Sequence, residues 1–195
     1  MKKRIEKSNY ILVTNTGQTQ GTYYHIKYII KNGESLKTDI DSLLTVIDNS
    51  LSTYNPNSLI SRINMGELII TDTMFRTVFR SANEVYNNTN GAFDCSIAPL
   101  VNAWGFGFTN KEEMDTLKVL ELLDLIDFKK IKLRKDSIFI PKKMMLDFNS
   151  IAQGYTVDVI AAMFEAQGLD SYLIEVGGEI RSKGLKKNNK PWLIR

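Results

Sequence analysis

The sequence of 195 residues contains a single cysteine, Cys95, and a single histidine, His25. One cysteine excludes an internal disulfide. Cys95 stands beside Asp94, so a nucleophilic thiolate is one interpretation, but the only histidine falls on a different predicted element. We favour a small buried residue as the interpretation of Cys95, and we expect His25 to have a structural role on a strand.

Long apolar runs are missing as well. No stretch approaches the roughly 20 apolar residues of a membrane-spanning helix, and no apolar segment of a secretory signal follows the basic N-terminus. The 25 basic and 22 acidic residues leave a net charge of only +3, which does not call for nucleic acid as a partner. The lysines within residues 183–190 have no interleaved aromatic side chains on which bases could stack, so we interpret this region as a solvated turn.

Hydrophobic residues make up 43% of the chain, which is enough for a core in one domain or in two small, tightly joined ones. Apolar alternation and helical spacing are mixed without a regular βαβ order, which indicates the α+β class. The predicted strands cover residues 22–30, 131–133, 138–140, 144–148, 172–176, 179–182 and 192–194. The predicted helices cover residues 35–51, 59–64, 72–86, 96–104, 114–123 and 151–167, and the helix of residues 72–86 is expected to be capped near Thr71 or Asp72.

The last predicted strand, residues 192–194, has no element after it. An unpaired edge strand is a liability in a complete protein. We therefore expect a chain that lacks its C-terminal portion, or one whose missing part is supplied by another chain.

The most informative stretch is LDFNSIAQGYTVD at residues 146–158, called here the DFNS segment. An apolar run ending at Phe148 meets a small polar turn, after which apolar residues recur at helical spacing. A strand that enters a helix through Asn149 and Ser150 leaves backbone N–H groups for an anion such as a phosphate. Asp147 adds a carboxylate for a sugar hydroxyl or a metal. An ordinary helix N-cap at Asn149 or Ser150 is the alternative.

A second informative stretch is GAFDCSIAPLV at residues 91–101, called here the GAFD segment, which leads into WGFG. With QGTYY, LSTY and SLISRIN upstream and VGGEI downstream, the two segments resemble the ApbE family, the Mg²⁺-dependent FAD:protein FMN transferases. The resemblance extends over roughly residues 17–195, and the length of the two segments makes it specific.

The resemblance implies an ApbE-like fold of mixed helices and antiparallel strands, with residues 1–195 forming the N-terminal and central part of one flavin transferase domain. It implies an enzyme whose substrate is FAD and whose metal is Mg²⁺. The implied reaction transfers FMN to a threonine hydroxyl of a target flavoprotein, a subunit of a redox complex, and releases AMP. Such phosphoryl transfer needs charge neutralisation, in-line positioning and a base for the incoming hydroxyl.

By position, the resemblance assigns Ser150 to the metal, through its backbone carbonyl, and Asp147 and Gln153 to FAD. Gln153 stands where many relatives carry a charged residue, which puts any charge role there in doubt. The other positions that the resemblance assigns to FAD are Gln20, Tyr54, Ala92, Phe93 and Asp94.

These candidates have structural alternatives. Core packing would explain Tyr54 and Phe93, and helix or turn capping would explain either Asp94 or Asp147. Arg62 suits either a phosphate or a surface ion pair. The glycines at residues 177–178 suit either a close approach to the pyrophosphate or a plain hairpin.

The family's remaining metal ligands, an aspartate and a threonine, and a histidine-bearing segment belong to a later half of its members that this sequence lacks. Three alternatives therefore stay open: FMN transfer to a protein, hydrolysis of FAD to FMN and AMP, and FAD binding without catalysis. Family members are usually exported, so the resemblance implies a periplasmic, inner-membrane-associated location. The missing signal leaves a cytoplasmic location open.

Overall fold

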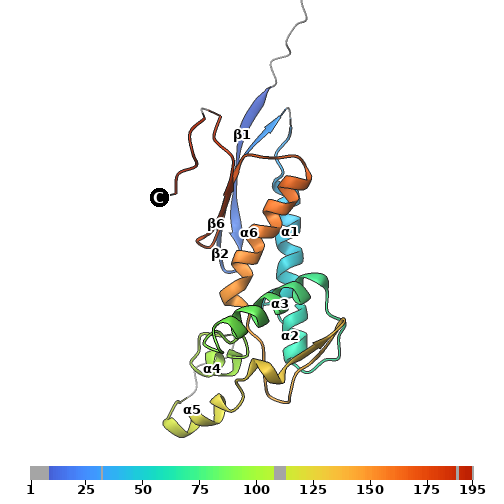
Figure 1. The fold of residues 1–195 in the computed structure, drawn as a ribbon, viewed down its shortest axis with the longest axis vertical. Coiled ribbons are helices and arrows are strands. Elements are labelled where there is room, and N and C mark those ends of the chain that lie inside the picture. Colours follow the sequence, from blue (N-terminus) through green and yellow to red (C-terminus); the bar gives the residue numbers. More distant parts are fainter. Residues whose placement is uncertain (1–8, 32, 108–112, 188, 195) are drawn as a thin grey trace, which may run out of the picture. The chain divides into compact units, whose positions relative to one another are not determined.

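The computed structural model describes residues 9–31, 33–107, 113–187 and 189–194 (Figure 1). The chain divides into two compact units, residues 1–44 with 153–195 and residues 45–152. Both boundaries fall inside helices, α1 (Lys37–Leu51) and α6 (Asn149–Ala166), so each helix contributes to both units. We call them the sheet unit and the helical unit and describe each by itself.

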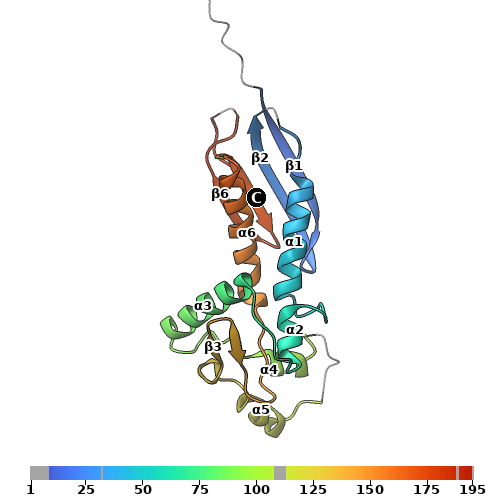
Figure 2. The ribbon, with the colours of Figure 1, turned by 90° about the vertical axis from the view of Figure 1, so that its right-hand side faces the viewer.

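The sheet unit is built on a four-stranded antiparallel sheet in the order β1-β2-β5-β6. Its strands are β1 (Tyr10–Thr19), β2 (Thr22–Lys31), β5 (Tyr172–Val176) and β6 (Glu179–Lys183). The sheet-unit parts of α1 and α6 lie on one face of this sheet (Figures 1 and 2). A two-residue turn joins β1 to β2, and its residues Gln20 and Gly21 have φ angles of 50° and 71°, as such tight hairpins require.

The core of the sheet unit follows from the alternation of its strands. Along β2, buried Tyr24, Ile26 and Tyr28 alternate with exposed residues, so one face turns toward the helices. The ring of Phe164 in α6 lies 4.9 Å from that of Tyr28 and 5.7 Å from that of Tyr172, between centroids. Complete burial of a large apolar side chain contributes about 1.5–3 kcal/mol, so this aromatic group anchors α6 to the sheet.

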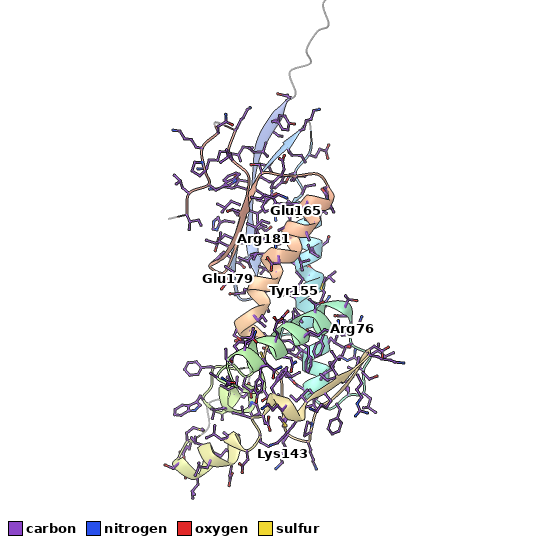
Figure 3. All side chains as sticks on the ribbon, in the orientation of Figure 1. Arg76, Lys143, Tyr155, Glu165, Glu179 and Arg181 are labelled. Atoms are coloured by element: carbon purple, nitrogen blue, oxygen red, sulfur yellow. The ribbon has the colours of Figure 1, made fainter. Side chains whose placement is uncertain are left out.

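Charged side chains join α6 to the edge strand β6. Arg181 lies 2.6 Å from the Asp158 carboxylate and 3.8 Å from that of Glu165, and Figure 3 shows Arg181 and Glu165 near each other. Lys183 lies 3.2 Å from Glu165, whose other partner is the Tyr172 hydroxyl at 2.6 Å. The hydrogen bond from Tyr172, followed by that from Lys183, lowers the pKa of Glu165. Because these groups are exposed, they orient the edge strand more than they stabilise the fold.

The helical unit contains short helices and one small hairpin around a second core. Its elements besides parts of α1 and α6 are α2 (Leu59–Asn64), α3 (Thr73–Asn88), α4 (Ala98–Ala103), α5 (Thr116–Leu123), the 3₁₀ helix η1 (Phe128–Lys130), β3 (Lys132–Arg134) and β4 (Ser137–Phe139). Aromatic rings fill the core: Phe75 packs on Phe148 at 5.3 Å, and Phe79 packs on Phe128 at 4.9 Å, between ring centroids.

Most predicted elements are confirmed. The helix at residues 59–64 has the predicted bounds, and Asp72 caps α3 by accepting a hydrogen bond of 2.7 Å from the Phe75 N–H. Pro99 lies in the first turn of α4, where the missing N–H of proline costs nothing. The predicted third long helix is only Thr116–Leu123, and it buries none of its residues. With no face against a core, such a helix is short.

Two predicted strands are wrong. Residues 144–148 form only an isolated parallel bridge between Met145 and Ile97, and residues 192–194 form no strand. Met144, Leu146 and Phe148 do alternate inward, but they enter a helical core that offers no strand for a ladder. Sequence patterning also missed β1, because its second half, NTGQT, is too polar and glycine-containing to resemble a strand.

Within the described part of the chain, no helix is both long enough and apolar enough to cross a membrane.

Candidate functional site

The GAFD and DFNS segments lie side by side in the helical unit. The N–H of Asp147 donates a hydrogen bond of 2.8 Å to the carbonyl oxygen of Cys95, and the bridge between Ile97 and Met145 continues the pairing. The two segments that carry most of the sequence resemblance are therefore one local structure.

Asp147 caps the start of α6. One of its carboxylate oxygens accepts the N–H of Asn149 at 2.6 Å, and the other accepts the Asn149 side-chain amide at 3.1 Å. The N–H groups of Ile151 and Ala152 both donate to the carbonyl of Phe148. The prediction that several N–H groups stay unpaired for an anion is therefore wrong for residues 149, 151 and 152. The capping side chain is Asp147, which agrees with its own capping alternative, rather than Asn149 or Ser150.

Asp147 carries a carboxylate that is partly buried. Burial raises its pKa above the ordinary value, and the two hydrogen bonds from Asn149 oppose that rise. A carboxylate with two oxygens can accept about four hydrogen bonds, so two contacts leave acceptor capacity for a hydroxyl or a cation. Ser150, the residue assigned to a metal, is exposed on the first turn of the helix.

The carboxylate of Asp94 hydrogen-bonds to other residues of the chain. One carboxylate oxygen accepts the N–H and the hydroxyl of Ser96, at 2.7 and 2.6 Å, and the other accepts the N–H of Phe128 at 3.1 Å. The Ser96 hydroxyl accepts in turn the N–H of Asp127 at 2.9 Å. Asp94 therefore fastens the GAFD segment to the loop that carries η1, and the capping alternative describes these contacts.

The thiol of Cys95 lies near enough to both carboxylates to feel their charge. Cys95 is buried, as predicted, and burial, followed by the charges of Asp147 and Asp94, raises the pKa of its thiol to about 12. A nucleophile needs a thiolate near neutral pH, so this environment argues against the catalytic interpretation of Cys95.

Ala92 and Phe93 form the turn that leads into Asp94. Ala92 is exposed and Phe93 is half-buried, and the Phe93 N–H donates to the Thr89 hydroxyl at 3.1 Å. The preceding Gly91 has a φ of 85°, in the left-handed region where glycine is at no disadvantage. Because Ala92 and part of Phe93 face solvent, both remain available to a ligand.

Tyr54 is 60% exposed, so core packing does not explain it. Its ring forms one wall of a cavity of about 320 Å³, and its hydroxyl donates to the carbonyl of Phe106 at 3.4 Å. The other residues around this cavity are Thr53, Pro56, Ser61, Asn64, Met65 and Met145.

Sequence analysis missed Asn64, which connects α2 to the DFNS segment. Its side-chain amide donates to the carbonyl of Leu146 and accepts the Leu146 N–H, both at 2.8 Å. Asparagine can pair with a peptide group in this way because it has both donor and acceptor. Position was the only signal: Asn64 ends the short apolar motif SLISRIN.

Gln20 and Gln153 belong to the sheet unit. The Gln20 amide donates to the Thr156 hydroxyl at 2.7 Å, while its oxygen is buried and has no partner among the described residues. The Gln153 amide lies against Gly177, where an added Cβ would come within 2.6 Å of Nε2. Gly177 thus permits a close contact within its own unit.

The contacts of the remaining candidates match the structural roles that were the alternatives to ligand binding. Arg62 forms an ion pair of 2.8 Å with Glu67. The glycines at residues 177–178 turn β5 into β6 with φ angles of 57° and 95°, as a hairpin requires. His25 lies on β2, 3.1 Å from Glu175 of the paired strand. Within the described ranges, no group of three or more histidine, cysteine or acidic residues could hold a metal by itself.

The fold is similar to those of solved flavin transferases. It superimposes on the flavin transferase ApbE from Vibrio cholerae with a TM-score of 0.88 and 34% identity, covering 95% of this chain and 63% of that one. The apo flavinyl transferase ApbE from Pseudomonas stutzeri gives a TM-score of 0.89 and 30% identity, covering 95% of this chain and 62% of that one. The sequence model of the ApbE family matches residues 20–195, and the chain belongs to this family.

Curated relatives give the same result. The FAD:protein FMN transferase of Vibrio cholerae serotype O1 is 36% identical over 193 residues, covering 92% of this chain and 57% of the relative. That of Haemophilus influenzae is 32% identical over 199 residues, covering 94% and 58%. The chain thus spans little more than half the length of these relatives.

Proposed function

We propose that this chain binds FAD and, with Mg²⁺, transfers its FMN portion to a threonine hydroxyl of a target flavoprotein. In this reaction the hydroxyl oxygen forms a bond to the FMN phosphorus, the pyrophosphate bond breaks, the hydroxyl proton is lost and AMP leaves. The observation that carries the proposal is the pairing of Asp147 with Cys95, which joins the two most specific family segments into one structure.

The residues at this pairing fit Mg²⁺. The ion prefers hard oxygen ligands and keeps several of its waters, so one or two carboxylates or carbonyls can hold it beside substrate phosphates. Asp147 offers a carboxylate with acceptor capacity to spare, and Ser150, which the resemblance assigns to the metal through its backbone carbonyl, is an exposed residue. Mg²⁺ would supply neutralisation of the phosphate charge. A nearby cation would also offset the desolvation that raises the pKa of Asp147.

The cavity beside Tyr54 fits a flat ring of FAD. Its walls combine the aromatic face of Tyr54 with methionine and proline side chains, which suit an aromatic ring. Asn149 donates to the Thr53 hydroxyl at 3.4 Å, so the loop that carries Tyr54 is joined to the turn at Asp147. In this proposal Tyr54 stacks on the ring, and Ala92 and Phe93 contact the nucleotide.

Gln20 and Gln153 remain proposed FAD contacts of the sheet unit. The buried, unpartnered oxygen of Gln20 supports this role, because an acceptor left without a donor costs about 1–3 kcal/mol that a ligand donor would recover. Asp94 acts in this proposal as a positioning residue for the GAFD segment. The proposed partner is a flavoprotein subunit of a redox complex, and the proposed location is the periplasmic side of the inner membrane.

The test is to incubate the chain with FAD and a candidate acceptor flavoprotein, with and without Mg²⁺. Mass spectrometry follows the acceptor and chromatography follows AMP. An Mg²⁺-dependent mass gain of one FMN on a threonine, matched by AMP, supports the proposal. AMP without modified acceptor favours hydrolysis of FAD instead, and neither product would overturn both catalytic alternatives.

A further inference from the structure

A second concave surface lies in the helical unit, apart from the cavity beside Tyr54. It has a volume of about 450 Å³ and is bounded by α3 and by the chain from η1 to the β3–β4 hairpin, which Figures 1 and 2 both show beside α3. We call it the cationic groove and define it by Arg80, Asn83, Asn87, Lys129, Lys132 and Lys135.

The charge of this groove has one sign. Four of its lining residues are cations, and among the described residues that line it none is acidic. Arg80, Lys132 and Lys135 make no ion pair with any described residue, while Lys129 lies over the Tyr86 ring at 5.7 Å. The whole chain has a net charge of only +3, so four converging cations are a local concentration rather than a general property. Such a surface attracts an anionic partner.

The groove is built on fixed elements. Arg80, Asn83 and Asn87 follow one another at helical spacing along one side of α3. The opposite wall includes Lys132 on β3 and Lys135 in the hairpin turn, where Lys135 has a φ of 54°. The backbone that carries these cations and amide groups is therefore already in place, which lowers the entropic cost of binding.

The floor of the groove decides which kind of anion it suits. Phe79 and Phe128 lie beneath it but are only 6% and 1% exposed, so neither offers a free face on which a nucleic-acid base could stack. The volume exceeds what a single phosphate would fill. Amide groups from Asn83 and Asn87 can pair with a peptide backbone, and the lysines and Arg80 can pair with its carboxylates.

We propose that the cationic groove docks an acidic segment of a partner protein. Its floor is connected to the candidate flavin site, because the Phe128 N–H donates to the Asp94 carboxylate at 3.1 Å. This connection favours the flavin acceptor as the partner, and that assignment alone rests on the proposed function.

The test uses the full chain and a short fluorescent peptide in which glutamate alternates with leucine. Fluorescence anisotropy measures its binding at low salt without FAD, so the result does not depend on transferase activity. The test variant combines Arg80→Gln, Lys132→Gln and Lys135→Gln. The matched control removes three charges elsewhere, by Lys142→Gln, Lys143→Gln and Lys187→Gln. All six side chains are exposed, so both variants are expected to fold, which circular dichroism checks.

Compared with the unchanged chain, we expect the groove variant to bind the peptide on the order of 10-fold more weakly and the control variant to bind it equally well. A peptide with glutamine in place of glutamate is expected to bind neither variant nor the unchanged chain. Equal weakening in both variants would overturn the proposal, since net charge alone would then explain binding. A single-stranded oligonucleotide of equal charge that binds the groove more tightly than the peptide would also overturn it. Peptide binding to the groove, combined with no FMN transfer in the separate assay with FAD, Mg²⁺ and an acceptor flavoprotein, would keep the docking site and refute the proposed function.

Discussion

The hydrogen bond of 2.8 Å from the Asp147 N–H to the carbonyl of Cys95 brings two carboxylates to the same thiol. The two acids have different partners. Asp94 accepts three hydrogen bonds from the chain, whereas Asp147, at the start of α6, accepts only from Asn149 among the described residues. We infer that Asp94 holds the local structure and that Asp147 faces the ligand.

This division predicts unequal effects on stability. Asp94→Ala leaves the donors of Ser96 and Phe128 without their acceptor, and we expect a loss of about 3 kcal/mol of unfolding free energy. Asp147→Ala removes one helix cap and relieves a poorly solvated charge, so we expect a loss of about 1 kcal/mol or less. Urea denaturation of both variants measures the difference. A larger loss for Asp147→Ala would reverse the assignment of the two acids.

Replacement of Tyr54 is expected to change FAD binding much more than folding stability. Because its side chain is 60% exposed, Tyr54→Ala is expected to change the unfolding free energy by less than about 0.5 kcal/mol. The same variant is expected to bind FAD roughly 3- to 10-fold more weakly and to quench flavin fluorescence less, because a stacked ring is lost. Tyr54→Phe keeps the ring and serves as the matched control, with quenching near that of the unchanged chain. Normal quenching by Tyr54→Ala would remove Tyr54 from the flavin site.

Two glycines of the sheet unit predict opposite effects of one added methyl group. In helix α6, a Cβ at Gly154 would meet no atom within 4 Å, so Gly154→Ala is expected to stabilise the chain by up to about 1 kcal/mol. At Gly17 the Cβ would lie 2.6 Å from the ring of buried Tyr24, so Gly17→Ala is expected to destabilise it by about 1–3 kcal/mol. Thermal unfolding compares them, and a destabilised Gly154→Ala would show that the helix needs glycine there.

The buried thiol of Cys95 is expected to react slowly with alkylating reagents. With a pKa of about 12, only about 10⁻⁴ of the thiol is ionised at pH 8, and burial also blocks access. We expect iodoacetamide to leave Cys95 unmodified in the folded chain and to alkylate it fully in urea, as mass spectrometry would detect. Rapid alkylation of the folded chain at pH 8 would contradict the buried environment.

Sequence patterning predicted elements best where local signals agreed with the fold. The helix of residues 59–64 and the cap at Asp72 depend only on residues close to them in the chain, so both could be predicted from the sequence. Residues 144–148 resemble a strand, but whether they pair depends on what lies beside them. Among the described residues, the one β-bridge that they form is with Ile97 of the GAFD segment. Long-range pairing of this kind is invisible to periodicity.

The candidate site shows the same limit. Resemblance pointed to Asp147, with capping as its alternative, but the sequence did not reveal that the donor to its carboxylate is the Asn149 N–H. Nor did it reveal that Asn64 pairs with the backbone of Leu146, because a single asparagine at the end of a helix has many uses. The residues of a site can thus be proposed from sequence, while their partners require the fold.

The most direct test of the account is a titration of the chain with FAD in the presence of Mg²⁺, following flavin fluorescence. The test variant is Asp147→Asn, which keeps the size of the side chain and removes its charge. The control is Glu84→Gln, an exposed acid on α3. We predict saturable binding that Asp147→Asn weakens about 10- to 100-fold, as the loss of one charge-assisted contact implies, while Glu84→Gln leaves it unchanged. Equal FAD affinity of Asp147→Asn and the unchanged chain would contradict the account.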